Sequence, residues 1–290
     1  MSALLEPPVR PEYELPELAV AEAGIAPPFT RVERVLSWAW LRKALLLLVL
    51  ALAWEALARW QDNDLLLPGA LQTARALAQG IVSGELPGYV AVSLAVLVQG
   101  YLAGIAGAFV LTSLAMSTRL GRDLLETLTA MFNPLPAIAL LPLALLWFGL
   151  GRASLVFVLV HSVMWPLALN MYAGFRSVPE SLRMTGRNYG LGQLRLLVQV
   201  MVPAALPAIL SGLKIGWAFA WRTLIAAELV FGTTSGKGGL GWYIFQSRNE
   251  LFTDKVFAGL ATVILIGLLV ENLVFQAVER FTVRRWGMQR

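Results

Sequence analysis

Six long runs of apolar residues divide the chain. They cover residues 38–58, 89–116, 124–148, 153–173, 203–231 and 256–279. Because an α-helix needs about 20 residues to cross the hydrocarbon core of a bilayer, each run predicts one transmembrane helix. A shorter stretch, residues 70–81, mixes apolar and polar residues with helical spacing, which is typical of a helix at the membrane surface. The pattern therefore predicts an all-α membrane protein with six spans.

The composition agrees with this prediction. Hydrophobic residues make up 58% of the chain, charged residues make up 14%, and the mean hydropathy is +0.68. One soluble core cannot bury so much apolar surface, so the chain needs lipid as a solvent. We expect a single transmembrane domain at residues 31–290 of the 290-residue chain.

Residues 1–30 differ from this domain in composition. They contain five glutamates, six prolines and a single basic residue, Arg10. They lack the order of basic region, apolar region and small-residue cleavage site that a secretory signal requires. An acidic, proline-rich segment buries too little apolar surface to fold alone, so we predict a disordered cytoplasmic tail, for which a regulatory role stays open.

Basic residues gather in every second loop. They precede the first predicted span, separate the second from the third and the fourth from the fifth, and follow the sixth. The residues are Arg31, Arg34, Arg42, Lys43, Arg119, Arg122, Arg176, Arg183, Arg187, Arg195, Arg280, Arg284, Arg285 and Arg290. Since short cytoplasmic loops are enriched in Lys and Arg, both termini should be cytoplasmic. Such clusters form no continuous basic face for nucleic acid, despite the net charge of +5.

The sequence has few residues that could bind a metal ion or form a catalytic centre. It has no cysteine and one histidine, His161, which are too few ligands for zinc. The glycine-rich loop at residues 232–241 contains the pattern GxGxxG. However, it lacks the β-strand of a dinucleotide site and the Ser or Thr that follows the lysine of a phosphate loop. We interpret the loop as a turn and expect no metal site and no enzymatic activity in this chain.

The basic loop at residues 176–195 has the signals of a short helix. Ser177 and Glu180 have the spacing of a capping box, and Pro179 suits the first helical turn. The helix should end near Gly190, because glycine tolerates the left-handed conformation that follows many helices.

The side chains of this predicted helix suit a docking element. Arg183 and Arg187 lie four residues apart and therefore on one face. Leu182 and Tyr189 offer apolar surface elsewhere. A short helix that projects into the cytoplasm with both kinds of surface is expected to bind a partner.

The same loop resembles a motif of the permease subunits of binding-protein-dependent ABC importers. That motif consists of Glu-Ala-Ala, three residues, Gly, nine residues and Ile-x-Leu-Pro. Here Met184, Thr185 and Gly186 stand at the first three positions, Gly190 at the glycine and Pro203 at the proline. The glycine, the spacing and the proline match, whereas Met184 replaces the acid, for which Glu180, one turn earlier, is a candidate substitute.

The resemblance covers roughly residues 35–285 and extends to the nitrate, sulfonate and taurine branch of the family. The similar segments are residues 133–136, 141–142, 147–151, 204–207, 226–229 and 239–241. It implies a type I ABC importer fold in which a cytoplasmic coupling helix, here residues 180–190, sits in a cleft of the ATPase. The implied coupling residues are Glu180, Arg183, Met184, Arg187, Tyr189, Gly190 and Pro203.

The resemblance also implies the partners of the chain. Two ATPase subunits would bind ATP and Mg²⁺, so the chain itself needs no cofactor. A second permease copy, identical in the favoured case, would complete the pathway. A periplasmic or lipid-anchored solute-binding protein would deliver a small anionic solute such as a sulfonate, nitrate, taurine or an aromatic acid. The assembly would lie in the bacterial inner membrane.

Polar residues inside the apolar spans are candidates for the translocation pathway, because a charge in hydrocarbon costs about 2.5–3.5 kcal/mol on insertion scales unless it is paired or hydrated. Arg222 either attracts an anionic substrate or forms a structural pair with Glu228 or Glu271. His161 is more often a hydrogen-bonded interior residue than a ligand. Asn133, followed by three prolines, predicts a broken third span that faces a cavity. The pathway candidates are thus Asn133, His161, Arg222 and Glu228.

Two other classes of protein compete with this interpretation. A secondary transporter or channel that works without an ATPase would explain the spans. It would leave the capped cytoplasmic helix and the spacing from Gly190 to Pro203 unexplained. A membrane-embedded enzyme has no catalytic constellation in this sequence.

Overall fold

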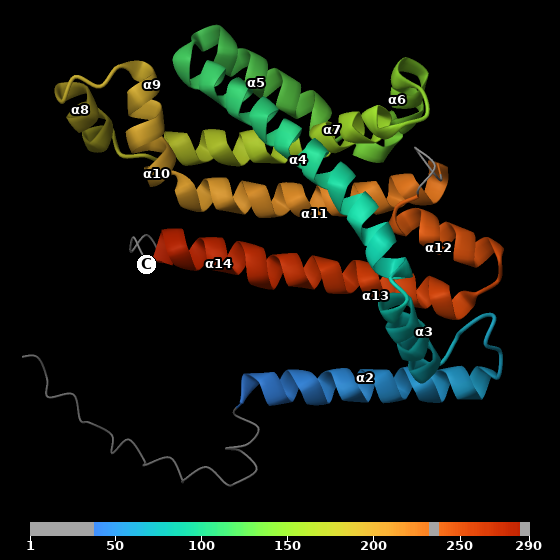
Figure 1. Cartoon of the computed structure of the whole chain (residues 1–290). Helices are drawn as coiled ribbons and strands as arrows, with labels where there is room; N and C mark the ends of the chain where they lie inside the picture. The colour runs from blue at the N-terminus through green and yellow to red at the C-terminus, as the bar shows by residue number, and fades with distance from the viewer. Residues whose placement is uncertain (1–37, 232–237, 285–290) are drawn as a thin grey trace, which may run out of the picture. The chain divides into compact units, whose positions relative to one another are not determined.

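The computed structural model describes residues 38–231 and 238–284 of the chain. Throughout these residues the secondary structure is helical, without a β-strand, which confirms the predicted all-α class (Figure 1). The chain divides into two compact units, Met1–Ala53 and Trp54–Arg290. The predicted tail at residues 1–30 and most of the predicted glycine-rich turn lie outside the described residues.

Three helical segments in the described part of the chain are long and apolar enough to cross a membrane. They are α4 (Glu85–Ser117), α7 (Arg152–Arg176) and the segment Thr253–Val283. The last segment consists of α13 (Thr253–Leu269), the π-helical η3 (Val270–Phe275), α14 (Gln276–Glu279) and most of the π-helical η4 (Arg280–Arg284). These segments coincide with the second, fourth and sixth predicted spans. The first predicted span coincides with the 23-residue helix α2 (Ala39–Gln61).

Two further helix pairs reach the required length and hydropathy only when each is counted as one bent span. The first joins α5 (Arg119–Phe132) to η1 (Ala137–Leu140) and α6 (Leu141–Phe148) at an angle of 91°. The second joins α9 (Gln193–Leu196), η2 (Leu197–Met201) and α10 (Val202–Ala204) to α11 (Leu206–Phe231) at 77°. The first break confirms the prediction made from Asn133. The count of six spans stays a prediction.

Prolines explain why the first pair breaks. Pro134 and Pro136 lie between α5 and η1, and neither has an N–H to donate to a preceding helical turn. The chain therefore leaves α5 after Phe132, turns, and resumes as a 3₁₀-helix at Ala137.

Helices α4, α7 and α11 form the centre of the larger unit, with α7 and α11 side by side and α4 crossing them (Figure 1). Small residues allow this close approach. A Cβ atom on Gly104 of α4 would lie 2.7 Å from the Cβ atom of Val163 on α7, and one on Gly212 of α11 would lie 2.8 Å from that of Asn170. The three helices therefore pack backbone against backbone at these points.

Two short helices, α3 (Ala70–Val82) and α12 (Leu240–Asn249), also belong to the larger unit. The amphipathic stretch predicted near residues 70–81 forms α3, although its place at a membrane surface stays a prediction. The sequence interpretation missed α12, which follows the glycine-rich loop and packs against α11 and α13.

Candidate functional site

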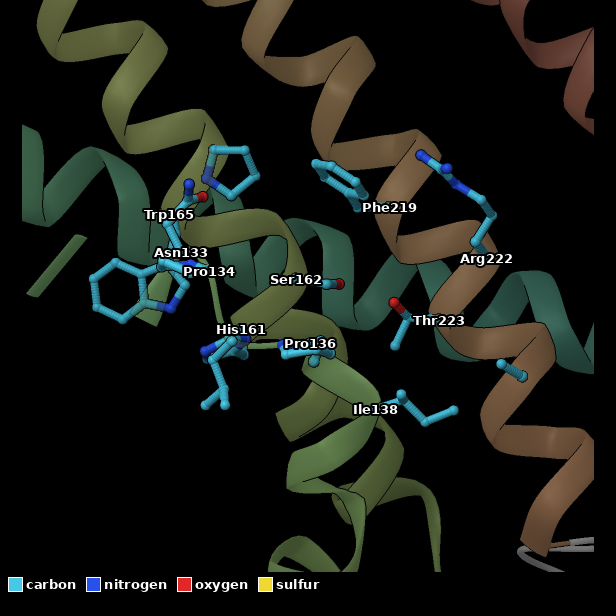
Figure 2. A pocket seen from close by; sticks show the side chains of 14 residues that line it. Asn133, Pro134, Pro136, Ile138, His161, Ser162, Trp165, Phe219, Arg222 and Thr223 are labelled. Atoms are coloured by element: carbon cyan, nitrogen blue, oxygen red, sulfur yellow. The ribbon is translucent and has the colours of Figure 1, made fainter. Parts of the chain in front are cut away.

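A cavity of about 400 Å³ lies between α7, α11 and the break that follows α5. Its residues come from three segments that are far apart in the sequence (Figure 2). The lining consists of Asn133, Pro134, Leu135, Pro136, Ala137, Ile138, His161, Ser162, Trp165, Pro166, Phe219, Arg222, Thr223 and Ala226.

Three of the four predicted pathway residues meet at this cavity. Asn133 comes from the broken segment, His161 from α7 and Arg222 from α11. The fourth, Glu228, lies further along α11 and is not part of the lining. The structure thus brings together the first three and separates them from Glu228.

Arg222 carries the only formal charge among the lining residues, all of which the structure describes. Its guanidinium carbon lies 5.1 Å from the centroid of the Phe219 ring. Within the described residues it forms no ion pair with Glu228 or Glu271, so the alternative of a structural pair is not found there. Glu271 instead lies 3.7 Å from the amine of Lys214. The cavity therefore has a positive charge that no lining carboxylate neutralises.

His161 is not the hydrogen-bonded interior residue that we expected. In the described part of the chain neither of its ring nitrogens has a hydrogen-bond partner. The imidazole lies edge-on to Phe132 and Trp165, with ring centroids 6.2 and 6.0 Å away. It thus belongs to an aromatic cluster that forms one wall of the cavity.

The remaining polar groups of the cavity were missed by the sequence analysis. Ser162 on α7 and Thr223 on α11 point toward one another (Figure 2). Each directly follows a residue that the sequence had singled out, His161 or Arg222. Both could have been identified from the sequence, because each is a polar residue next to a pathway candidate inside an apolar span.

Glu228 lies in a buried cluster instead, which we call the Glu228 cluster: Ser93, Glu228, Leu240 and Gly241. The Ser93 hydroxyl lies 2.8 Å from each carboxyl oxygen of Glu228, and the Gly241 N–H donates to the same carboxyl group at 2.8 Å. The Leu240 N–H donates to the Ser93 hydroxyl, also at 2.8 Å. Glu228 is only 3% exposed. The cluster therefore ties the N-terminus of α12 to α4 and α11.

The predicted cytoplasmic helix exists as α8 (Glu180–Asn188), but its N-terminal cap differs from the prediction. The Ser177 hydroxyl donates to the carbonyl of Gly174 at 2.8 Å and so belongs to the end of α7. Pro179 occupies the N-cap position without a side-chain hydrogen bond. The predicted capping box is thus wrong, because Ser177 bonds backward to the preceding helix. The predicted end is correct, since Gly190 has a φ of +74°.

Arg183 attaches α8 to α7. One of its terminal nitrogens donates to the carbonyl of Phe175 at 2.6 Å, in the last turn of α7. The carboxylate of Glu180 lies 3.6 Å from Arg183 and 4.0 Å from Arg187. These contacts hold α8 at a defined angle to a helix that lines the cavity.

Packing also joins α8 to the following segment. Gly186 lies against Leu196, and a Cβ atom on Gly186 would collide with that side chain. Pro203 lies in α10, just before α11.

Helix α8 exposes apolar side chains among its polar ones. Met184 and Tyr189 are 54% and 83% exposed, and Leu182 is partly exposed. Together with the exposed Glu180 and Arg187, these side chains offer both apolar and charged groups to a partner.

Comparison with known proteins identifies the chain's relatives. The family model described as "Binding-protein-dependent transport system inner membrane component" matches residues 100–286. The chain is similar to the taurine transport system permease protein of Escherichia coli, with 32% identity over 81% of this chain and 86% of that protein. It is 31% identical to a protein of Methanocaldococcus jannaschii assigned as an ABC transporter permease, over 81% and 89%. The nitrate import permease protein of Synechocystis is 26% identical, over 89% and 95%. These matches confirm the resemblance found in the motif.

Proposed function

Because the chain belongs to the family of binding-protein-dependent transport system inner membrane components, we propose that it is the permease subunit of an ATP-driven importer for a small anionic solute. The membrane helices reorient a central cavity, and a separate ATPase supplies the energy. A solute-binding protein delivers the solute from the other side of the membrane.

One observation supports an anionic substrate: the positive charge of Arg222 in the cavity, which no lining carboxylate neutralises. At an effective dielectric constant of about 20, a unit charge about 4 Å away interacts with the guanidinium by about 4 kcal/mol before desolvation is subtracted. The names of two relatives agree with this chemistry, since nitrate is an anion and taurine carries a sulfonate. Thr223, also in the lining, adds a hydroxyl donor for the oxygens of such a group.

In this proposal helix α8 binds the ATPase and transmits its conformational change to the membrane helices. Its exposed residues, Met184 and Tyr189, contact the ATPase, while Glu180 and Arg187 add polar contacts at the edge. Since Arg183 holds α8 to the end of α7, a displacement of α8 moves α7 and with it the cavity wall at His161. The loop is rich in arginine, which favours its place on the cytoplasmic side.

The assembly contains a second copy of the permease, two ATPase subunits that bind ATP and Mg²⁺, and the binding protein. The chain itself holds no cofactor and catalyses no hydrolysis. Both of its termini face the cytoplasm of a bacterial cell. Membership of the family supports this assembly.

The substitution Arg222→Met tests the role of the cavity. In the reconstituted complex, we expect the KM for solute uptake to rise at least about tenfold, equivalent to 1.4 kcal/mol of lost binding. Arg222→Lys, which keeps the charge, should retain most of the affinity.

Lys214→Met is the matched control, because it removes a cation of the same helix that lies outside the cavity lining. Equal KM values for the Arg222→Met variant and the unaltered complex would contradict the proposal. Equal losses in Arg222→Met and Lys214→Met would do so as well.

A further inference from the structure

A second cavity, of about 290 Å³, lies beside α8. The end of α4, helix α8 and the segment α9–η2 surround it. Its lining consists of Ser113, Met116, Ser117, Arg183, Arg187, Gln193, Leu194, Leu196, Leu197 and Met201. It shares no lining residue with the cavity at Arg222.

Two buried polar atoms of this cavity lack a partner. Within the described residues, neither the hydroxyl of Ser113 nor the Nε of Arg183 has a hydrogen-bond partner. A guanidinium Nε can only donate, so the missing partner of Arg183 must be an acceptor. Buried donors are normally satisfied, which makes two orphans in one cavity an indication of an absent ligand or water.

The charges of the cavity favour an anion. Its lining contains two arginines and no carboxylate. The nearest counter-charge among the described ion pairs is the half-exposed carboxylate of Glu180, which lies 3.6 Å from Arg183 and 4.0 Å from Arg187, in both cases beyond hydrogen-bonding distance. Arg187 therefore keeps donors for another acceptor.

The cavity also has an apolar part. Its apolar lining residues are Met116, Leu194, Leu196, Leu197 and Met201. A ligand that suits this lining carries a compact anionic group for the arginines, and the cavity limits the volume of that group to the lower end of small-molecule sites, about 300 Å³. Guanidinium groups bind phosphate oxygens in pairs, and basic pockets between membrane helices suit lipid head groups.

We propose that this cavity binds a phosphate group, supplied either by the head group of an anionic phospholipid or by free phosphate. The ligand accepts hydrogen bonds from Ser113 on α4 and from Arg183 and Arg187 on α8. It therefore bridges α8 to the membrane helices and strengthens the attachment of the coupling element. The site depends on the cavity alone and would stand even if the transported solute were not an anion.

The experiment uses the purified transporter complex in nanodiscs. One set contains phosphatidylcholine alone and is titrated with inorganic phosphate, and a second set contains added phosphatidylglycerol without phosphate. The thermal midpoint of unfolding is measured in each. A rise with phosphate identifies free phosphate as a ligand, whereas a rise only with phosphatidylglycerol identifies the lipid head group.

Three variants assign the effect to the cavity. Arg187→Gln removes one exposed cation of the lining, and Ser113→Val fills the cavity without a change of charge. Arg195→Gln is the control, since Arg195 is an exposed arginine of the same loop outside the lining. We expect about a tenfold loss of phosphate affinity, or loss of the lipid-induced shift, in Arg187→Gln and Ser113→Val but not in Arg195→Gln.

Three results would overturn the proposal. The first is the absence of a shift with either probe. The second is a shift that survives in both Arg187→Gln and Ser113→Val, and the third is an equal loss in Arg195→Gln, which would indicate a general effect of surface charge. Since Arg187 is 65% exposed at its side chain, its substitution tests the site even if Ser113→Val does not fold. Uptake is measured separately, so failure of this site and failure of the proposed transport function remain distinguishable.

Discussion

The substitution Ser93→Ala should destabilise the membrane domain through the Glu228 cluster. It removes a hydroxyl that donates to the carboxyl group of Glu228 and accepts from the N–H of Leu240, each at 2.8 Å. Hydrogen bonds between membrane helices average about 0.6 kcal/mol and reach about 1.7 kcal/mol. A buried donor left without a partner costs about 1–3 kcal/mol more. Loss of the contact together with an orphaned Leu240 N–H should therefore cost about 2 kcal/mol.

Ser162→Ala is the matched control for stability. Ser162 is also buried, but its hydroxyl donates at 2.8 Å to the carbonyl of Leu159 within its own helix. A hydrogen bond within one helix contributes little to the free energy of unfolding, so the control should lose less than about 0.5 kcal/mol. The assay is the apparent free energy of unfolding in mixed micelles of increasing denaturing detergent.

A double-mutant cycle sharpens the same test. Ser93→Ala combined with Glu228→Gln should give a coupling energy of at least about 1 kcal/mol, because the two side chains contact each other directly. Equal losses of stability in Ser93→Ala and Ser162→Ala, or a coupling energy of zero in the cycle, would show that the Glu228 cluster does not attach α12 to α4 and α11.

Two further predictions concern α8. Arg183→Met removes the 2.6 Å hydrogen bond to Phe175, worth about 1.5–3 kcal/mol for a charged donor, and should lower the solute transported per ATP hydrolysed by the complex. Arg183→Lys should recover part of that ratio, and an unchanged ratio in Arg183→Met would exclude α7 as the route of coupling. Gly190→Val places a β-branched residue at φ +74° and should cost at least about 1–2 kcal/mol in the unfolding assay. The control Gly192→Val, at φ −64°, should cost little, and equal losses would mean that backbone strain is not the cause.

The helices were predictable because their cause is local. A run of about 20 apolar residues has few alternatives to a helix in lipid, and polar residues within it are costly enough to stand out. Asn133, His161 and Arg222 were found in this way. Their convergence on one cavity was not predictable, because it depends on how α7 packs on α11 and on the direction of the break after Phe132.

The differences between the sequence predictions and the structure have physical causes of the same kind. Ser177 had the spacing of a capping box, yet a serine can also bond back to a carbonyl three residues earlier, and the end of α7 offered that carbonyl. Glu228, a pathway candidate because a carboxyl group in a membrane helix is costly, lies outside the lining of the cavity. Its partner Ser93 lies 135 residues away, so the sequence held no sign of the contact that satisfies it.

We propose that this chain moves a small anionic solute with energy supplied by a separate ATPase. The most direct measurement is uptake into proteoliposomes that contain the chain with its ATPase, with binding protein outside and ATP inside. We predict uptake that requires all three components and ATP hydrolysis, and that a second anion of the same class inhibits. Uptake by the purified chain alone, at a rate that ATP and the ATPase do not change, would contradict the account and favour a secondary transporter or channel.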